Sequence, residues 1–222
     1  SEMCIRDRGK LELHKDLSDL MPQMTSIPIM KADGGLVEPK NAITLHHLLT
    51  HTAGFGYPGI TYKQNPRFNK ESWKHEDFPR QFESGTRFLY GTNTDWVGKI
   101  VEKVSGMSLE AYFKQYIFAP LGINSTYFNV PEKDKKRITS LGNRGPDGKG
   151  KLREIDGDEY SPNRYPLKDV IDYSGGGGLF STPNDFTKIL KCMLNYGAYK
   201  GGRVLKKVTV KEMIKNQIGD IS

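Results

Sequence analysis

Two segments of the chain carry wide apolar stripes at helical spacing, and they constrain the fold more than any other feature. The later segment has the best helix start in the chain, with Thr182 as N-cap, Pro183 at the first helical position and Asp185 as a capping acid. It is expected to run to about Asn195, before Gly197. Stripes of this width have to be buried against another layer of structure. The stripe residues are expected to be Trp96, Val97, Ile100, Val101 and Val104 in the earlier segment, which ends at Gly106, and Phe186 to Leu194 in the later one.

Residues that begin and end helices mark three further helical segments and leave long loops between them. Residues 56–87 and 129–168 lack clear periodicity and are predicted to be loops, and no strongly alternating strand series is present. The chain is therefore predicted to be mostly helix and loop. The expected starts are Thr44 for a short helix with Leu45, Leu48 and Leu49 on one face, Thr92 with Asp95 for the earlier striped segment, Ser108, and Thr209 with Glu212 for a helix over 207–218; the expected stops are Gly54, Pro120 and Gly219.

The composition is that of a globular protein with many loops. Of 222 residues, 36% are hydrophobic and 27% are charged, with 24 glycines and 12 prolines, which excludes a coiled coil, a collagen or a disordered tail. No run of about 18 apolar residues occurs, so no transmembrane segment is predicted. Two cysteines, Cys4 and Cys192, do not make a disulfide framework. The compartment stays open between cytoplasmic and periplasmic or secreted, and so does the oligomeric state.

The net charge of +7 does not predict a nucleic-acid partner. A nucleic-acid surface would need clustered cations with aromatic residues between them. The densest basic stretch, residues 133–137, contains Asp134 and comes after Glu132, and we interpret it as a solvated loop. The basic balance favours anionic substrates only weakly. No nucleic-acid partner is therefore expected.

The beginning of the chain differs from the rest of it. Residues 1–8 show neither helical nor strand periodicity and resemble translated adapter sequence, so we interpret them as a foreign or artefactual leader. Gly9 could cap a preceding helix, but residues 1–8 are not expected to form one. The folded part is therefore expected to be residues 9–222, as a partial domain.

Motifs that mark a catalytic nucleophile are missing from residues 1–222. No serine has a lysine three positions later, and no Gly-x-Ser-x-Gly elbow occurs. Cys192 lies inside the later striped helix, beside Met193 and Leu194, where a buried structural thiol is favoured over a reactive one.

Two further patterns are weak signals for ligand binding. His47 and His51 are four residues apart, as metal ligands on one helical face would be, but no glutamate lies between them and no third ligand is evident. His51 is better explained at a helix C-terminus, where its ring can bond a free carbonyl. The glycines at 175–178 lack the lysine and Ser/Thr of a phosphate loop and more simply allow a sharp turn or a close backbone approach. Neither a metal nor a cofactor is predicted.

Tyr90 is the candidate for acid–base chemistry. It lies two positions before Thr92, so the N-terminus of the next helix points toward its neighbourhood. A positive helix end, together with a nearby lysine, would favour the phenolate and make it a usable base. The alternative is that Tyr90 is one of 11 tyrosines and is merely packed.

Taken in order, five segments resemble the penicillin-recognising serine hydrolases, in the branch of class C β-lactamases, family VIII carboxylesterases and D-aminopeptidase-like proteins. The resemblance spans roughly residues 9–219. It implies an α+β fold of the β-lactamase/transpeptidase type, of which this chain would be an internal fragment covering mainly the helical region, with most of the antiparallel sheet missing. The segments are Gly9-Lys10-Leu11-Glu12-Leu13, Ile43 to Phe55 (ITLHHLLTHTAGF), Tyr90 to Gly98 (YGTNTDWVG), Ile117 to Gly122 (IFAPLG) and Gly175 to Asp185 (GGGGLFSTPND).

The resemblance implies roles for particular residues. In the family, a Ser-x-x-Lys helix supplies the nucleophile, the tyrosine of a Tyr-x-Asn motif shuttles the proton, and a Lys/His-x-Gly strand helps to bind the substrate carboxylate. Tyr90 matches the tyrosine, as general base and acid. The asparagine position falls on Thr92, with Asn93 adjacent as the second candidate, and this departure favours the esterase-type members. The other two elements are expected before residue 1 and beyond Ser222.

The leading hypothesis is a fragment of a serine hydrolase whose parent acts on a small-molecule ester, amide or β-lactam through an acyl-enzyme. Without the nucleophile the fragment would be inactive as it stands. The alternative is a non-catalytic homologue of the same fold that binds a ligand or peptidoglycan, and a Ser-x-x-Lys upstream in the parent gene would favour the enzyme. Both striped helices are expected to lose part of their cover with the missing sheet and nucleophile helix, leaving a helical but loosely packed chain.

Overall fold

The computed structural model of this chain describes residues 2–62, 77–139, 142–143, 153–154 and 170–221. Its helices are α1 (Glu2–Asp7), α2 (Pro22–Thr25), α3 (Leu45–Leu49), α4 (Pro58–Thr61), α5 (Asn93–Ser105), α6 (Leu109–Phe113), the π-helical segment η3 (Lys114–Phe118), α7 (Ala119–Leu121), α8 (Glu132–Lys135), α9 (Pro183–Leu194) and α10 (Lys207–Met213). None of these described helices is long and apolar enough to span a membrane.

The strands of the described residues form three small antiparallel pairs: β1 (Ile29–Met30) with β2 (Leu36–Val37), β3 (Gly142–Asn143) with β4 (Arg153–Glu154), and β5 (Ala198–Tyr199) with β6 (Gly202–Arg203). In the first pair Ile29 lies opposite Val37, and in the last Ala198 lies opposite Arg203. Each strand has two residues, so the sheets add little to the core. Helices therefore dominate the described part of this α+β structure, as the sequence predicted.

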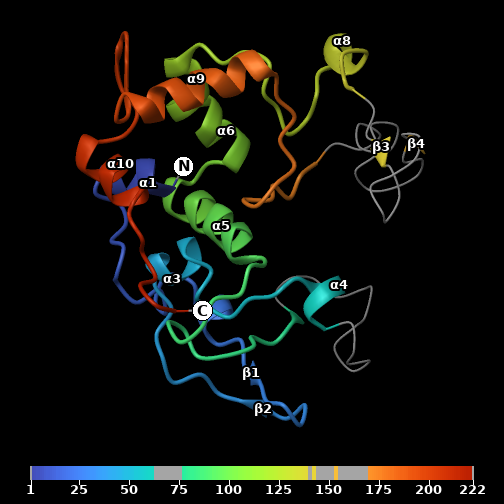
Figure 1. Cartoon of the computed structure of the whole chain (residues 1–222), viewed down its shortest axis with the longest axis vertical. Coiled ribbons are helices and arrows are strands. Elements are labelled where there is room, and N and C mark those ends of the chain that lie inside the picture. The colour runs from blue at the N-terminus through green and yellow to red at the C-terminus, as the bar shows by residue number, and fades with distance from the viewer. Residues whose placement is uncertain (1, 63–76, 140–141, 144–152, 155–169, 222) are drawn as a thin grey trace.

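The core is built around α5, at the centre of the molecule (Figure 1). Its neighbours are α1, α3 and α6, which pack against different parts of its surface. The stripe predicted from the sequence is confirmed, with Val104 partly buried and the other four positions almost fully buried. The expectation that this stripe loses its cover is therefore wrong, because residues 11–55, together with α1 and α6, supply it. The main cluster consists of Leu17, Met21, Met24, Ile27, Ile43, Leu45, Leu48, Ala53, Phe55, Trp96, Val97 and Ile100.

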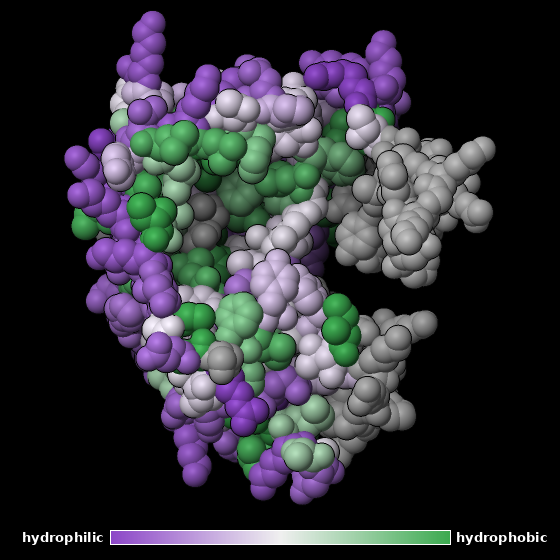
Figure 2. Space-filling model, viewed as in Figure 1, coloured by the Kyte–Doolittle hydropathy of each residue, from purple (hydrophilic) through white to green (hydrophobic). Residues whose placement is uncertain are grey.

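Helix α9, at the top of Figure 1, confirms the predicted start and end but not a buried stripe. The Thr182 hydroxyl accepts a hydrogen bond from the Asp185 amide at 3.2 Å, and the helix ends at Leu194. Its long apolar side chains stay open, with Phe186 55% exposed, Leu190 47% and Leu194 79%. Figure 2 shows hydrophobic surface gathered in the upper half of the molecule, over this helix. The stripe of α9 therefore lacks the cover that the stripe of α5 has.

Two predicted capping residues, Asp95 and Thr209, bond distant partners instead of capping a helix. Thr92 precedes α5 but makes no capping bond, and the Asp95 carboxylate accepts from Ser174 and from the Gly176 amide at 3.2 Å. Thr209 lies inside α10, which begins after Lys206 and ends at Met213, well before residue 218. The Thr209 hydroxyl donates to Asp7, so it joins α10 to α1.

The short helix α3 begins as predicted and ends earlier. Its N-cap Thr44 forms a capping box with His47, in which each side chain bonds the other residue's amide at 3.3 Å. Leu45 and Leu48 are buried, and Leu49 is partly buried. The helix ends at Leu49, and Gly54, with φ +90°, belongs to the turn after it.

The helix that Ser108 begins passes through Pro120, where the sequence predicted a stop. The Ser108 hydroxyl caps α6 by accepting from the Ala111 amide at 3.2 Å. The next five residues form η3, whose wider turn uses hydrogen bonds from residue i to i+5. This turn gives room for a proline ring that clashes with the carbonyl four residues back in an ordinary α-helix. The helix ends at Gly122, where φ is +64°.

Short helices occur within two segments that were predicted to be loops. The segment expected to be one loop over 56–87 contains α4, and the basic stretch expected to be a solvated loop contains α8. Within α8 and just after it, Lys135 pairs with Glu132 and Arg137 with Asp134, so part of the basic charge is neutralised locally. The predicted turn at 145–148 lies outside the described residues.

The first residues form α1, against the expectation that no helix precedes Gly9. Met3, Cys4 and Ile5 are buried, and Gly9, with φ +72°, ends the helix by donating its amide to the Arg6 carbonyl at 2.8 Å. The sequence missed this helix because six residues are too few to display a helical period. The foreign origin of residues 1–8 stays a prediction.

Candidate active site

Tyr90 lies at the centre of the turn that leads into α5, which we call the tyrosine turn (Leu89–Asn93). Its side chain is 59% exposed, in contrast to Gly91, Thr92 and Asn93, which are buried. The Tyr90 ring lies 4.5 Å from the His51 ring and 5.7 Å from the Tyr57 ring, measured between centroids. The phenol ring therefore packs against two other rings, and much of its surface remains accessible to a reacting molecule.

His51 joins the tyrosine turn to the segment after α3. Its carbonyl accepts the Leu89 amide at 2.9 Å. On the ring, Nδ1 accepts the Gly91 amide at 3.4 Å and lies 3.2 Å from the Asn93 side-chain nitrogen. His51 lies just after the C-terminus of α3, as expected, and its Nδ1 faces the N–H groups of the tyrosine turn rather than a helix carbonyl.

Asn93 lies beneath Tyr90 as the first residue of α5 and is fully buried. Its Nδ2 donates to the Phe55 carbonyl at 3.0 Å and to the Leu89 carbonyl at 3.5 Å. Its Oδ1 has no hydrogen-bond partner among the described residues. The amide is therefore oriented by two carbonyl oxygens on one side and presents a free acceptor on the other.

The charge state of the site depends on the burial of His51. Burial lowers the pKa of His51, and the nearby Asp95 carboxylate opposes that shift without reversing it. The imidazole is therefore neutral at pH 7. Because Nδ1 accepts a hydrogen bond, the single ring proton belongs on Nε2.

The base of the tyrosine turn is fixed by close backbone packing. A Cβ at Gly91 would lie 2.2 Å from the Phe55 carbonyl oxygen, so only glycine fits there. The Phe55 segment is in turn held by Arg80, a fully buried residue whose Nη1 donates to the Ala53 carbonyl at 3.2 Å and to Ser84 at 2.9 Å. No sequence signal singled out Arg80, because a buried arginine is recognisable only from the carbonyls around it.

The glycine run lies against the first two turns of α5. A Cβ at Gly175 would lie 2.0 Å from the Thr94 carbonyl oxygen, and one at Gly98 would lie 3.0 Å from the Gly175 backbone. Close backbone approach therefore explains Gly175, and the φ of +87° at Gly178 marks a turn, as the simpler interpretation predicted. Ser174 and the Gly176 amide donate hydrogen bonds to Asp95, so a third segment of the chain lies beside the tyrosine turn.

The other sequence candidates lie elsewhere or have different tasks. His47 uses Nδ1 in the α3 cap, whereas His51 lies beyond the end of that helix. Within the described residues, no group of three or more His, Cys, Asp or Glu could hold a metal ion. Cys192 is buried as predicted, and burial raises the pKa of its thiol, which disfavours the reactive thiolate. The letters of a Lys-x-Gly motif occur at 200–202, but there they form the turn of the β5–β6 hairpin.

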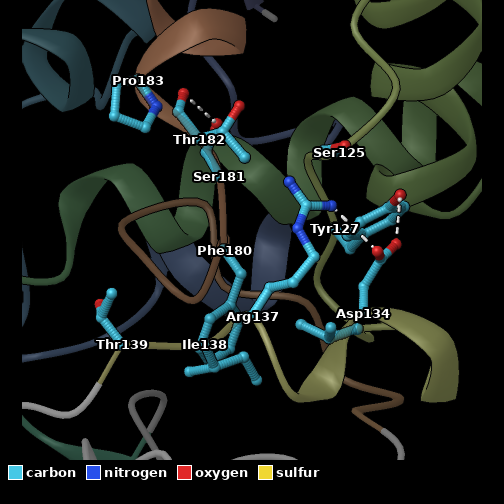
Figure 3. Close-up of a pocket in the computed structure, with 11 residues that line it drawn as sticks. Ser125, Tyr127, Asp134, Arg137, Ile138, Thr139, Phe180, Ser181, Thr182 and Pro183 are labelled. Carbon is cyan, nitrogen blue, oxygen red and sulfur yellow. Dashed lines mark hydrogen bonds and ion pairs between the residues drawn. The ribbon is translucent and has the colours of Figure 1, made fainter.

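A pocket of about 470 Å³ lies between the segment after α8 and the start of α9, and none of the predicted site residues lines it. Figure 3 shows its charged side chains bonded to each other, with Asp134 accepting from both Tyr127 and Arg137. One side of the pocket is formed by Thr182 and Pro183, at the start of α9. Because its charged groups are paired internally, this pocket offers less chemistry than the tyrosine turn.

The family model described as Beta-lactamase matches residues 3–220, almost the whole chain. The chain belongs to the β-lactamase family. This confirms the family resemblance that the five sequence segments indicated, and with it the α+β fold of the β-lactamase/transpeptidase type.

Two of the similar proteins are named as an acyltransferase and an esterase. Monacolin J acid methylbutanoyltransferase of Aspergillus terreus is 30% identical over 228 residues, covering 94% of this chain and 52% of that protein. Lovastatin esterase of Penicillium rubens is 32% identical over 233 residues, covering 97% of this chain and 56% of that protein. The chain thus spans about half the length of these curated relatives.

A solved structure of simvastatin synthase from Aspergillus terreus superposes with a TM-score of 0.78 at 29% identity, covering 95% of this chain and 54% of that one. The likeness extends over nearly all of the present chain. The small sheets described above agree with a partial domain of this β-lactamase fold, in which the helical region predominates.

Proposed function

We propose that this chain is the tyrosine-bearing part of a serine enzyme that transfers acyl groups of small-molecule esters, amides or β-lactams through an acyl-enzyme. One observation carries the proposal: the Tyr90 phenol stands open on a buried, hydrogen-bonded turn at the start of α5. A tyrosine that was merely packed would be largely buried with its neighbours. Tyr90 is 59% exposed, whereas the three residues after it are buried.

In the proposed reaction, Tyr90 moves one proton at two moments. As a serine oxygen attacks the carbonyl carbon of the substrate, the phenolate accepts the serine proton. When the tetrahedral adduct collapses, the bond to the leaving oxygen or nitrogen breaks, and Tyr90 returns the proton to that atom. Water, or the hydroxyl of an acceptor molecule, then attacks the acyl-enzyme with the same proton movement.

The nucleophile of this scheme belongs to the parent protein outside residues 1–222. No serine of the chain is followed by lysine at the third position, and the relatives are about twice as long. The chain by itself is therefore proposed to be inactive. Asn93 is proposed to support the site, with its unpartnered Oδ1 as the atom available for a polar contact.

Esters are the favoured substrate class within this proposal. Thr92 stands where true β-lactamases have the asparagine of Tyr-x-Asn, and this difference favours the esterase-type members. The names of the two relatives, an acyltransferase and an esterase, support the same choice. An acyl acceptor that carries a hydroxyl group is therefore a reasonable alternative to water.

The decisive experiment removes one hydroxyl from the parent enzyme. Tyr90→Phe is expected to fold normally and to lose about 10²–10⁴-fold in ester turnover, because it lacks only the proton-carrying atom. Tyr199→Phe, a hydroxyl deletion in the distant β5–β6 hairpin, serves as the matched control and should keep wild-type turnover. Turnover of Tyr90→Phe within about threefold of wild type would show that the proton shuttle is another group.

A second experiment uses the 222-residue chain alone. Incubation with a fluorophosphonate probe and a chromogenic ester should give neither serine labelling nor hydrolysis, because no activated serine is present. Stoichiometric labelling of a serine would refute the assignment of the nucleophile to the parent. A parent protein that binds ligand without any turnover would instead favour the non-catalytic homologue.

A further inference from the structure

His51 has a strained backbone conformation and contacts most residues of the tyrosine turn. It has φ +56°, the left-handed region that side-chain-bearing residues rarely adopt. This conformation brings the carbonyl and the ring of one residue to the same side, so that His51 contacts four of the five residues of the tyrosine turn. They are Leu89 through its amide, Tyr90 through its ring, Gly91 through its amide and Asn93 through its side chain.

We propose that His51 is the positioning residue of Tyr90, acting as a neutral imidazole that accepts the Gly91 amide at Nδ1 and packs its face against the tyrosine ring. No other described contact holds both the backbone and the ring of the tyrosine turn. The statement that this affects catalysis rests on the proposed function, whereas the hydrogen-bond geometry stands apart from it.

The choice of tautomer depends on the neighbours of Nδ1. The Gly91 amide can only donate. The Asn93 nitrogen lies 3.2 Å from Nδ1 and also faces the Phe55 and Leu89 carbonyls, so the side chain presents its nitrogen, and not its oxygen, to the ring. A proton on Nδ1 would therefore face N–H groups and break the hydrogen bond from the Gly91 amide.

The surroundings of the ring favour this neutral form. Burial lowers the pKa of His51. Asp95, at the start of α5, is the charged group that raises it, and the aromatic rings of Tyr90 and Phe88 flank the imidazole. Acid strong enough to protonate Nδ1 would release the Gly91 amide and loosen the tyrosine turn.

Two substitutions in the parent enzyme separate the acceptor from the ring. His51→Asn keeps an acceptor close to the place of Nδ1, and asparagine tolerates the left-handed conformation. His51→Phe keeps a ring against Tyr90 and removes the acceptor. We expect His51→Phe to lower kcat by roughly 10²-fold with KM within about threefold of wild type, and His51→Asn to recover kcat to within about tenfold. His14→Phe, at an exposed histidine, is the control and should leave kcat unchanged.

A spectroscopic measurement tests the geometry without using activity. In the parent protein labelled with ¹⁵N-histidine, the His51 signals, assigned by their loss in His51→Asn, should report a bare Nδ1 and a protonated Nε2 at pH 7.5. The Gly91 amide should exchange slowly with solvent in the wild type and His51→Asn, and at least about tenfold faster in His51→Phe. This comparison decides the question even if His51→Phe has low activity for lack of stability.

The outcomes separate the two proposals. A proton on Nδ1, or Gly91 exchange unchanged in His51→Phe, overturns the positioning role whatever the turnover. A His51→Phe enzyme within about threefold of wild type, while Tyr90→Phe is inactive, overturns it as well. If Tyr90→Phe is itself fully active, the proposed function fails, and the nitrogen signals and Gly91 exchange still decide the role of His51.

Discussion

Helices α5 and α9 carry similar apolar stripes, but only the stripe of α5 is buried. Both are amphipathic, at 13 and 12 residues, and both were predicted from the same kind of pattern. The stripe of α5 is buried by α1, α3 and α6, whereas α9 contacts chiefly β5 and α7 at its ends and sides. Ile100 of α5 is 0% exposed, and Leu194 of α9 is 79% exposed.

The difference shows that an apolar stripe predicts that a helix face has to be buried. It does not predict which other part of the chain buries that face. α5 finds its cover within the chain, in residues 11–55 before it and in α6 after it. α9 does not, within the described residues. A free energy of burial of about 1.5–3 kcal/mol for each large side chain is thus gained at α5 and not realised at α9.

Truncating one residue in each stripe should show the largest difference between the two helices in the free energy of unfolding. Ile100→Ala is expected to destabilise the chain by about 2–5 kcal/mol, because it leaves a cavity in a packed core. Leu194→Ala should change the free energy of unfolding by no more than about 0.5 kcal/mol, because its side chain is already in solvent. Urea melts of both variants measure the contrast, and equal losses would mean that α9 is covered after all.

A pair of glycine substitutions tests how tightly the loop before α9 seals α5. Gly175→Ala should cost about 1–3 kcal/mol, because the added methyl would meet the Thr94 carbonyl oxygen at 2.0 Å and would force the backbones apart. Gly177→Ala has no heavy atom within 4 Å of its added methyl and should be neutral or slightly stabilising. Thermal melts compare the two. If both variants melt together, the close contact between the loop and α5 is not maintained in solution.

The open stripe of α9 should make the isolated chain bind hydrophobic dye and self-associate. Replacing Leu190 and Leu194 together by lysine should reduce dye fluorescence by roughly half or more and shift sedimentation toward the monomer. Ile171→Lys, at a residue outside α9 that is 89% exposed, is the control and should change little. A wild-type chain that binds no dye and sediments as a monomer would show that α9 needs no further partner.

Acid should weaken the α5 side of the molecule through three histidines at and just after α3. Burial lowers the pKa of His46, His47 and His51 below the ordinary value of 6.5. The unfolded chain then binds more protons than the folded one, so the stability is complete above about pH 6.5 and is lost as the pH falls through the lowered folded values. Between pH 7.5 and 5.5 we expect a smaller loss than that of Ile100→Ala, seen in urea melts.

One variant isolates part of this pH effect. Glutamine at the third position of a helix can complete a capping box with Thr44 without titrating, so His47→Gln should match the wild type at pH 7.5 and lose less stability at pH 5.5. α9 contains no histidine, so its end of the molecule should be insensitive over this range. An unchanged pH slope in His47→Gln would assign the effect to His46 and His51.

Local signals in the sequence located the longer helices, missed α1, α4 and α8, and misassigned two capping residues. Thr44, Ser108 and Thr182 act as N-caps as predicted, since each bonds an amide three residues away. The prediction failed for Asp95 and Thr209, because a partner far along the chain offers a competing hydrogen bond. The same limit applies to the candidate site, where Tyr90 and Asn93 were selected by family order and the contact of His51 with the tyrosine turn was not predicted.

The sequence by itself determined where the two longest helices form, that Gly106 ends the first of them, and that Tyr90 precedes a helix start. These features depend on residues within one or two turns of each other. The tertiary structure alone decided which stripe is covered, which nitrogen of His51 accepts, and where the Asp95 carboxylate binds. Those outcomes depend on pairs such as His51 with Gly91, 40 residues apart, and Asp95 with Ser174, 79 apart. Burial and hydrogen-bond pairing depend on which groups the fold places next to each other, and a local sequence pattern does not specify these neighbours.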